Sequence, residues 1–88
     1  MLMQTADAGL RRHTQVQRMI RFFERKGDYV RCETRKTTDG AYELVITHPN
    51  GTERVERFED SALLARRQVE IERSMSTEGW AGPFGRVV

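Results

Sequence analysis

Cys32 and His48 are the residues that come nearest to a catalytic nucleophile and its base. Polar and apolar residues alternate around both of them, so a hairpin would place them diagonally on one face, with their backbones about 7 Å apart. That separation is too long for a good hydrogen bond, and no third residue orients the histidine. We therefore predict that the protein is not an enzyme, keep Cys32/His48 as the one exception, and interpret Cys32 as a small buried hydrophobic residue.

The sequence indicates no metal site and no cofactor. The candidate Cys/His ligands are Cys32, His13 and His48, and they lack the Cys-x-x-Cys or His-x-x-x-His spacing of known sites. An acidic stretch follows later in the chain, where three glutamates alternate with arginines; it consists of Glu53, Glu56, Glu59 and Asp60. We interpret this stretch as a solvated strand edge and a helix start.

A basic ridge is the first candidate binding surface. A helical pattern from Leu10 to Lys26 would put apolar side chains on one face and arginines on the opposite one. An aromatic residue between cations can stack on a nucleic-acid base while the arginines bind phosphates. The predicted nucleic-acid-binding residues are Arg18, Arg21, Phe22, Arg25 and Lys26. The alternative interpretation is an ordinary solvated helix face.

The C-terminal arm, residues 79–88, is the second candidate surface. It combines four large apolar side chains, Trp80, Phe84, Val87 and Val88, with glycines and a proline. Burying one such side chain contributes roughly 1.5–3 kcal/mol, so the arm should not stay in water. It either wraps its own domain or docks on another chain, where Trp80 would be a natural anchor.

The elements that position these residues follow from periodicity. Leu10–Lys26 predicts a helix that ends at Gly27. Tyr29–Lys36 and Ala41–His48 alternate with period two and flank a Thr38-Asp39-Gly40 turn, which predicts a hairpin. Its register should pair Cys32 with Ile46, Thr34 with Leu44 and Arg35 with Glu43.

A third strand and a second helix complete the pattern. The register of Glu53–Phe58 after the Pro49-Asn50-Gly51 turn stays open, because either Val55 or Phe58 could face inward, and we expect a bulge or an early end near Phe58. Asp60 is a suitable N-cap for a helix that reaches about Glu78 and stops at Gly79. Its inner stripe should be Leu64, Ile71 and Met75.

The predicted fold is α+β: a two-layer sandwich of α-β-β-β-α order, with a three-stranded antiparallel meander packed against two helices. This element order, over about residues 10–78, is similar to that of the double-stranded-RNA-binding domain. That family has a Lys-rich start to its second helix and a Gly-Pro-x-His loop. The corresponding segments here are Asp60–Leu64 and Lys36–Gly40, which match neither motif, so the similarity in order implies no RNA binding.

Composition sets the remaining expectations. The 88 residues suit a single domain in which residues 1–9 fray, 10–78 form the folded unit and 79–88 form the arm. Residues 1–7 do not resemble a signal peptide, the single cysteine fits a reducing compartment and no apolar run spans a bilayer, which together predict a cytoplasmic protein. The leading hypothesis is a non-enzymatic protein-interaction module whose partner is another protein or a second copy, in a homodimer formed through the arm. Nucleic-acid binding along the basic helix is the alternative, and no small-molecule substrate is evident.

Overall fold

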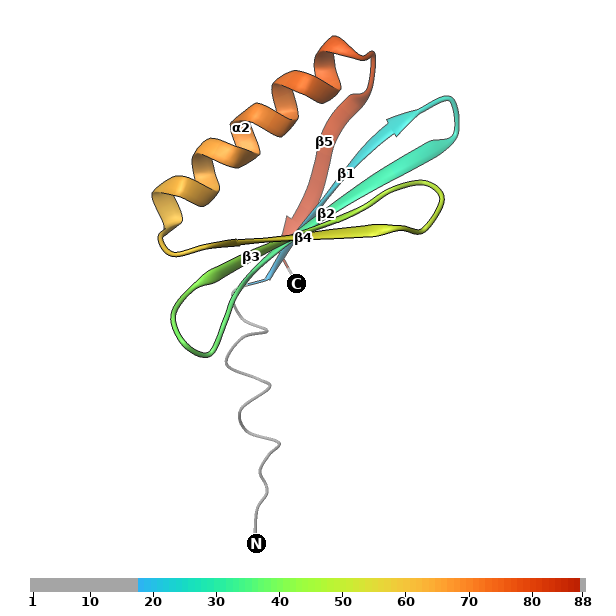
Figure 1. Cartoon of the computed structure of the whole chain (residues 1–88). Helices are drawn as coiled ribbons and strands as arrows, with labels where there is room; N and C mark the ends of the chain where they lie inside the picture. Colours follow the sequence, from blue (N-terminus) through green and yellow to red (C-terminus); the bar gives the residue numbers. More distant parts are fainter. Residues whose placement is uncertain (1–17, 88) are drawn as a thin grey trace, which may run out of the picture.

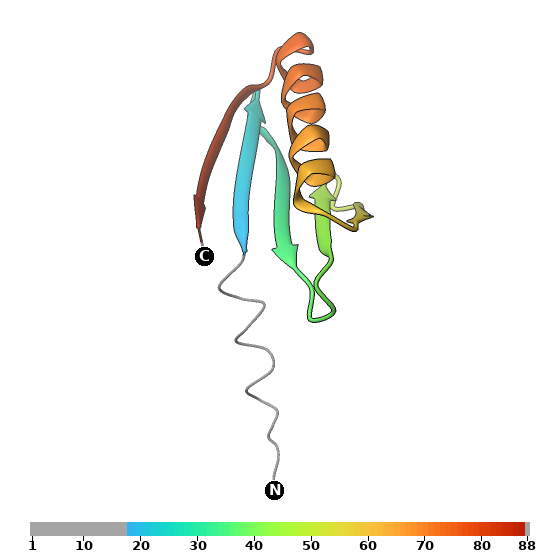
Figure 2. The same cartoon turned by 90° about the vertical axis from the view of Figure 1, so that its left-hand side faces the viewer.

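Four consecutive segments of the chain are strands, and the period-two alternation of apolar and polar residues is clear in the second and third of them. The computed structural model describes residues 18–87, in the order β1 (Met19–Arg25), β2 (Asp28–Lys36), β3 (Tyr42–Thr47), β4 (Glu53–Phe58), α2 (Ser61–Thr77) and β5 (Ala81–Val87). The strands form one antiparallel sheet of order β4-β3-β2-β1-β5 (Figure 1). Helix α2 lies as a second layer on one face of that sheet (Figure 2).

The predicted α-β-β-β-α order is wrong. Residues 10–17 lie outside the described range, but Met19–Arg25, the second half of the expected first helix, is strand β1. The described residues therefore form five strands and one helix, which also removes the similarity to the double-stranded-RNA-binding order.

The misassignment has a local physical cause. Lys26 and Gly27 both have positive φ, 53° and 86°, and they form the two-residue turn of a hairpin in which Arg25 pairs with Asp28. A glycine of this kind also ends helices, so Gly27 satisfies both interpretations. Pairing with β2 on one side and β5 on the other then decides the outcome for β1.

The first predicted hairpin is confirmed as β2–β3. Cys32 pairs with Ile46, Thr34 with Leu44 and Arg35 with Glu43. On the face away from α2, Arg35 Nε donates to Glu43 Oε1 at 3.0 Å. The turn residues, the hydrophobic pattern and the charge pairing all predicted this register. All three involve residues that are close in sequence.

The open register of the third predicted strand, β4, is now defined. Tyr42 pairs with Phe58 and Val45 with Val55 in an unbroken ladder, so Phe58 faces the helix and Val55 faces away. No bulge interrupts the β3–β4 ladder, and β4 ends at Phe58, the last residue of the predicted strand. Because the Pro49-Asn50-Gly51 turn has three residues, β4 adopts the register in which Phe58, and not Val55, faces inward.

Helix α2 matches its prediction closely. The Asp60 side chain accepts a hydrogen bond from the Leu63 N–H at 2.9 Å, which caps the first turn. Gly79 ends the helix with φ of 87°, and the Trp80 N–H returns to Met75 O at 2.9 Å. This helix, the one found in residues 18–87, is neither long nor apolar enough to cross a membrane.

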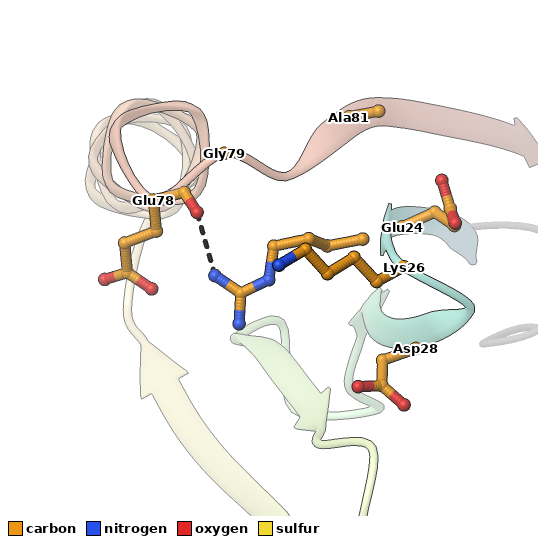
Figure 3. Close-up of a pocket in the computed structure, with 7 residues that line it drawn as sticks. Glu24, Lys26, Asp28, Glu78, Gly79 and Ala81 are labelled. Atoms are coloured by element: carbon orange, nitrogen blue, oxygen red, sulfur yellow. Dashed lines mark hydrogen bonds between the residues drawn. The ribbon is translucent and has the colours of Figure 1, made fainter.

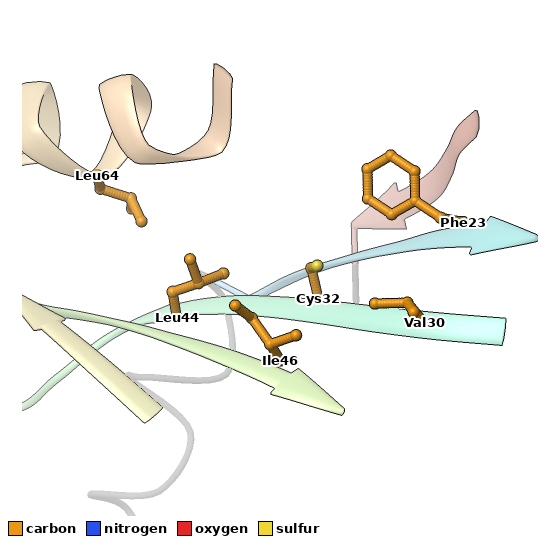
Figure 4. Packing of buried hydrophobic residues seen from close by; sticks show 6 residues of the cluster. All are labelled: Phe23, Val30, Cys32, Leu44, Ile46 and Leu64. Atoms are coloured by element: carbon orange, nitrogen blue, oxygen red, sulfur yellow. The ribbon is translucent and has the colours of Figure 1, made fainter. Parts of the chain in front are cut away.

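The core lies between α2 and the sheet (Figure 4). Alternate residues of β1, β2 and β3 point toward the helix, and Leu64 closes the layer from above. The buried cluster comprises Phe23, Val30, Cys32, Leu44, Ile46 and Leu64, and Tyr42, Phe58, Ile71, Met75 and Trp80 pack around it. The predicted inner stripe of α2 is thus confirmed.

Candidate interaction surface beside the C-terminal strand

The predicted basic ridge is divided between the two faces of the sheet. Successive residues of a strand point to opposite sides, so Arg21 and Arg25 face α2 whereas Phe22 faces away. Arg21 Nη1 bonds Glu72 Oε2 at 2.6 Å, and Arg25 Nη1 bonds the Glu78 carbonyl at 2.8 Å. These arginines attach the helix to the sheet and are not grouped on one free surface.

The other two members of the ridge are also separated. Arg18 precedes β1, and its Nε bonds Glu33 Oε2 at 2.8 Å on the outer face, the sheet face away from α2. Lys26 lies in the β1–β2 turn, on the rim of an open cleft of about 530 Å³. Arg25 Nη1 reaches the Glu78 carbonyl across that cleft, and both acidic and basic side chains line its walls (Figure 3). Such mixed charges favour neither an anionic nor a cationic ligand.

Charges balance on the outer face. Glu33 is buried at its centre and accepts from Arg18 and, at 3.0 Å, from Arg31, with Arg35 at 3.7 Å. Among the described residues, the charged side chains on the outer face of β1–β4, together with Arg18 just before β1, are four arginines and four glutamates. They are Arg18, Arg31, Arg35, Arg57, Glu24, Glu33, Glu43 and Glu53. Across β1–β4, the outer face therefore carries no excess of positive charge of the kind that nucleic-acid surfaces have.

The C-terminal arm is built into the sheet as β5. Trp80 packs on the rim of the core, with the Arg25 guanidinium 4.5 Å above its ring. Val87 pairs with Met19 at the far end of the strand, and Val88 lies outside the described residues. Of the arm residues predicted to bind a partner, Trp80 is thus engaged within the chain.

Phe84 is different, because it is 55% exposed. It pairs with Phe22 across the β1–β5 ladder, which puts both rings on the outer face. Residues 81–85 carry no charge, and β1 is the one described strand that pairs with β5. Within residues 18–87, two aromatic side chains therefore lie on one face beside an unpaired strand edge whose first charged residue is Arg86.

The Cys32/His48 pair does not form a common site. Cys32 is buried under α2, and this burial raises the pKa of its thiol to about 11, which opposes thiolate formation. His48 is exposed just after β3 and lines a separate cleft of about 310 Å³ between the sheet and the second half of α2. Within residues 18–87, no cluster of three metal-ligating side chains occurs either.

Of the two edges of the sheet formed by the described residues, β5 was not predicted from the sequence. The meander implied β4 as one edge, but β1 and β5 were interpreted as helix and irregular arm. The hydrophobic residues of the arm could be identified from the sequence. Its role as an edge strand could not, because β5 pairs with β1, and β1 was predicted to be a helix. No protein-family model, curated protein or solved structure matches this chain.

Proposed function

We propose that this domain is a non-enzymatic protein-interaction module that binds an extended, apolar segment of another protein along β5. The observation that carries the proposal is the exposure of Phe84 beside Phe22 on the edge strand β5. Sheet edges are ordinarily protected by charged side chains, because unpaired backbone groups attract other strands. Residues 81–85 carry no charged side chain, and the first charge of β5 is Arg86.

The backbone of β5 can accept a further strand at its C-terminal half. A Cβ added to Gly85 would lie 2.9 Å from Ile20 O, and one added to Gly82 would lie 2.7 Å from Phe22 O, so these carbonyls point toward β5. Backbone groups alternate sides along an antiparallel strand, which directs the N–H and C=O of Gly85 away from β1. An added strand would bond there and cover Phe84.

The bulge in β5 limits the length of this edge. Phe22 pairs with Phe84 and Glu24 with Ala81, so Gly82 and Pro83 lie together opposite Phe23. Proline has no N–H to donate, and bulges interrupt pairing. The docking surface therefore begins at Phe84, and a short segment with an apolar residue facing Phe22 and Phe84 is the ligand that fits it.

A peptide-binding experiment tests this proposal. Extended peptides that alternate apolar and polar residues would be titrated into the isotope-labelled chain, and amide shifts would be followed by NMR. We expect shifts at Gly85 and Phe84, and about tenfold weaker binding for Phe84→Ser, because hot-spot aromatics carry much of the binding energy. Tyr29→Ser is the matched control, since Tyr29 is 58% exposed on β2 away from β5.

Three other results would contradict the proposal. Equal binding by wild type and Phe84→Ser would remove β5 as the docking surface. A dimer that is lost in Phe84→Ser but kept in Tyr29→Ser would mean that a second copy of the chain, and not another protein, binds along β5. That result would correspond to the self-association through the arm that the sequence predicted. Binding of single-stranded nucleic acid that weakens strongly between about 50 and 200 mM salt would restore the nucleic-acid alternative.

A further inference from the structure

Strand β4 forms the opposite edge of the sheet and has a different character. Among the strands of residues 18–87 it pairs with β3 alone, it contains no proline, and its ladder with β3 is regular from Glu53 to Phe58. Val55 is 56% exposed on the outer face, at the middle of this edge. A regular edge of this length, with an apolar residue at its centre, can pair with another strand unless its charges prevent it.

The β3–β4 turn shows which backbone groups of β4 are free. The His48 N–H donates to Thr52 O at 2.9 Å, so His48 and Thr52 form a hydrogen-bonded pair at the base of the turn. Hydrogen-bonded and non-hydrogen-bonded pairs alternate along an antiparallel ladder. Arg54 and Glu56 therefore bond to β3, and the N–H and C=O groups of three residues point outward; these are Glu53, Val55 and Arg57.

The charges of β4 are arranged with opposite signs at equal distances from Val55. The sequence from residue 53 to residue 57 is Glu-Arg-Val-Glu-Arg. If a second copy of the strand runs antiparallel with Val55 opposite Val55, each Glu53 meets an Arg57 and each Arg54 meets a Glu56. Opposite charges placed directly across an antiparallel pair are stabilising, and like charges are destabilising.

We propose that the chain forms a homodimer in which β4 pairs with β4 of a second copy, on a twofold axis at Val55. This proposal does not rest on the proposed function, because it concerns the other edge of the sheet. The outward groups of Glu53, Val55 and Arg57 then all find backbone partners. The result is one continuous antiparallel sheet through both protomers, with both α2 helices on the same face and a free β5 at each end.

Charge also excludes the neighbouring registers. A twofold axis at Arg54 or at Arg57 would place arginine against arginine, and one at Glu53 or at Glu56 would place glutamate against glutamate. Pairing centred at Arg54 or Glu56 would also put backbone groups that already bond to β3 at the interface. Val55 is thus the single centre that satisfies charges and backbone together.

The side chains are positioned to use both faces of this interface. On the outer face, Val55 would meet its symmetry mate between two Glu53–Arg57 pairs, and it would lose the exposure it has in the single chain. On the helix face, Arg54 Nε already lies 2.9 Å from Glu56 Oε2 and is mostly exposed, so a second Glu56 would extend an existing ion pair. Such alternation of charge forms a network, which contributes more than isolated surface pairs do.

A charge-swap series measured by light scattering behind size exclusion, over a range of protein concentrations, tests the dimer. Arg57→Glu should raise the dissociation constant about tenfold or more, because it puts two glutamates opposite each other at both ends of the shared ladder. Glu53→Arg should do the same by placing arginines together. The double variant Glu53→Arg/Arg57→Glu restores opposite charges with their signs reversed, so it should dimerise like the wild type.

Circular dichroism of each variant shows whether its fold is kept, because Arg57 also bonds Asp39 and Glu59 within the chain. On a sample that mixes labelled and unlabelled chains, isotope-filtered NMR should connect the Val55 methyl groups of the two protomers. A monomer at all concentrations, or a dimer indifferent to the single swaps, would overturn the proposal. Phe84→Ser should leave this dimer intact, so that failure of the β5 proposal and failure of the β4 proposal give different results.

Discussion

The ion pair between Arg67 of α2 and Glu56 of β4 should stabilise the attachment of the helix to the sheet by a measurable amount. Arg67 Nε and Nη2 bond the two oxygens of Glu56 at 2.8 and 3.1 Å, and the Glu56 side chain is 16% exposed. Bidentate bonds of this type are stronger than single neutral ones. Because solvent still reaches Arg67, we expect a coupling free energy of about 1–2 kcal/mol, below the sum of two fully buried charged bonds.

A double-mutant cycle with Arg67→Met and Glu56→Gln measures this coupling. Urea unfolding would be followed by the fluorescence of Trp80, at a protein concentration that gives a single species in light scattering. The pair Arg57–Glu59 serves as control, because its side chains are 46% and 76% exposed and its Nε–Oε2 distance is a comparable 3.1 Å. That exposed pair should couple more weakly than the Arg67–Glu56 pair, because solvent screens it.

The pH dependence of the coupling has a defined sign. The hydrogen bonds from Arg67 lower the pKa of Glu56 below its ordinary value of 4.5. A group whose pKa is lowered on folding contributes stability that is full above its unfolded pKa and lost as the pH falls through its folded pKa. The coupling should therefore be constant from about pH 7 to about 5 and shrink below about 4. A coupling no larger than that of the control pair, or one that persists unchanged in strong acid, would refute this reasoning.

Three further predictions concern stability and reactivity. Leu44→Ala should destabilise the fold by about 2–5 kcal/mol in urea unfolding, because Leu44 is 0% exposed at the centre of the core; a loss below about 1 kcal/mol would contradict the packing described. Gly85→Ala should lower the stability in thermal unfolding by about 1–3 kcal/mol, because the added Cβ would lie 2.9 Å from Ile20 O and 3.1 Å from Arg21 Cγ. An unchanged unfolding midpoint would show that β5 does not pair with β1 in this register. Cys32 should react with a thiol reagent at mildly alkaline pH far more slowly than the unfolded chain does, because burial raises the pKa of its thiol to about 11; similar rates in native buffer and in urea would argue against its burial.

The proposals also have a joint architectural consequence. Pairing at β4 consumes one edge of each protomer, so the dimer closes and cannot extend by the same contact. The β5 edges then lie at the two ends of the shared sheet, each with its own Phe84. If both proposals hold, the dimer is bivalent, and a target that carries two extended segments should bind more tightly than one that carries a single segment.

Local chemistry determined much of the middle of the chain. Asp60 and Gly79 set the bounds of α2 because an N-cap side chain and a left-handed glycine act within one helical turn. The β2–β3 hairpin followed from the turn at Thr38–Gly40 together with the pairing of Arg35 and Glu43. In both regions the residues that specify the structure are neighbours in sequence, so the sequence alone was sufficient.

Tertiary structure decided β1, β5 and the register of β4. Residues 19–25 fit a helical stripe and an alternating strand almost equally well, and Gly27 ends either one. What selects the strand is hydrogen bonding to β2 on one side and to β5 on the other, and β5 lies at the opposite end of the described chain. The candidate surface depends on the same long-range pairing, because Phe22 and Phe84 share a face only once β1 and β5 are adjacent. The arm could be identified from its composition, whereas its exposed aromatic and free edge arise from contacts that no local pattern encodes.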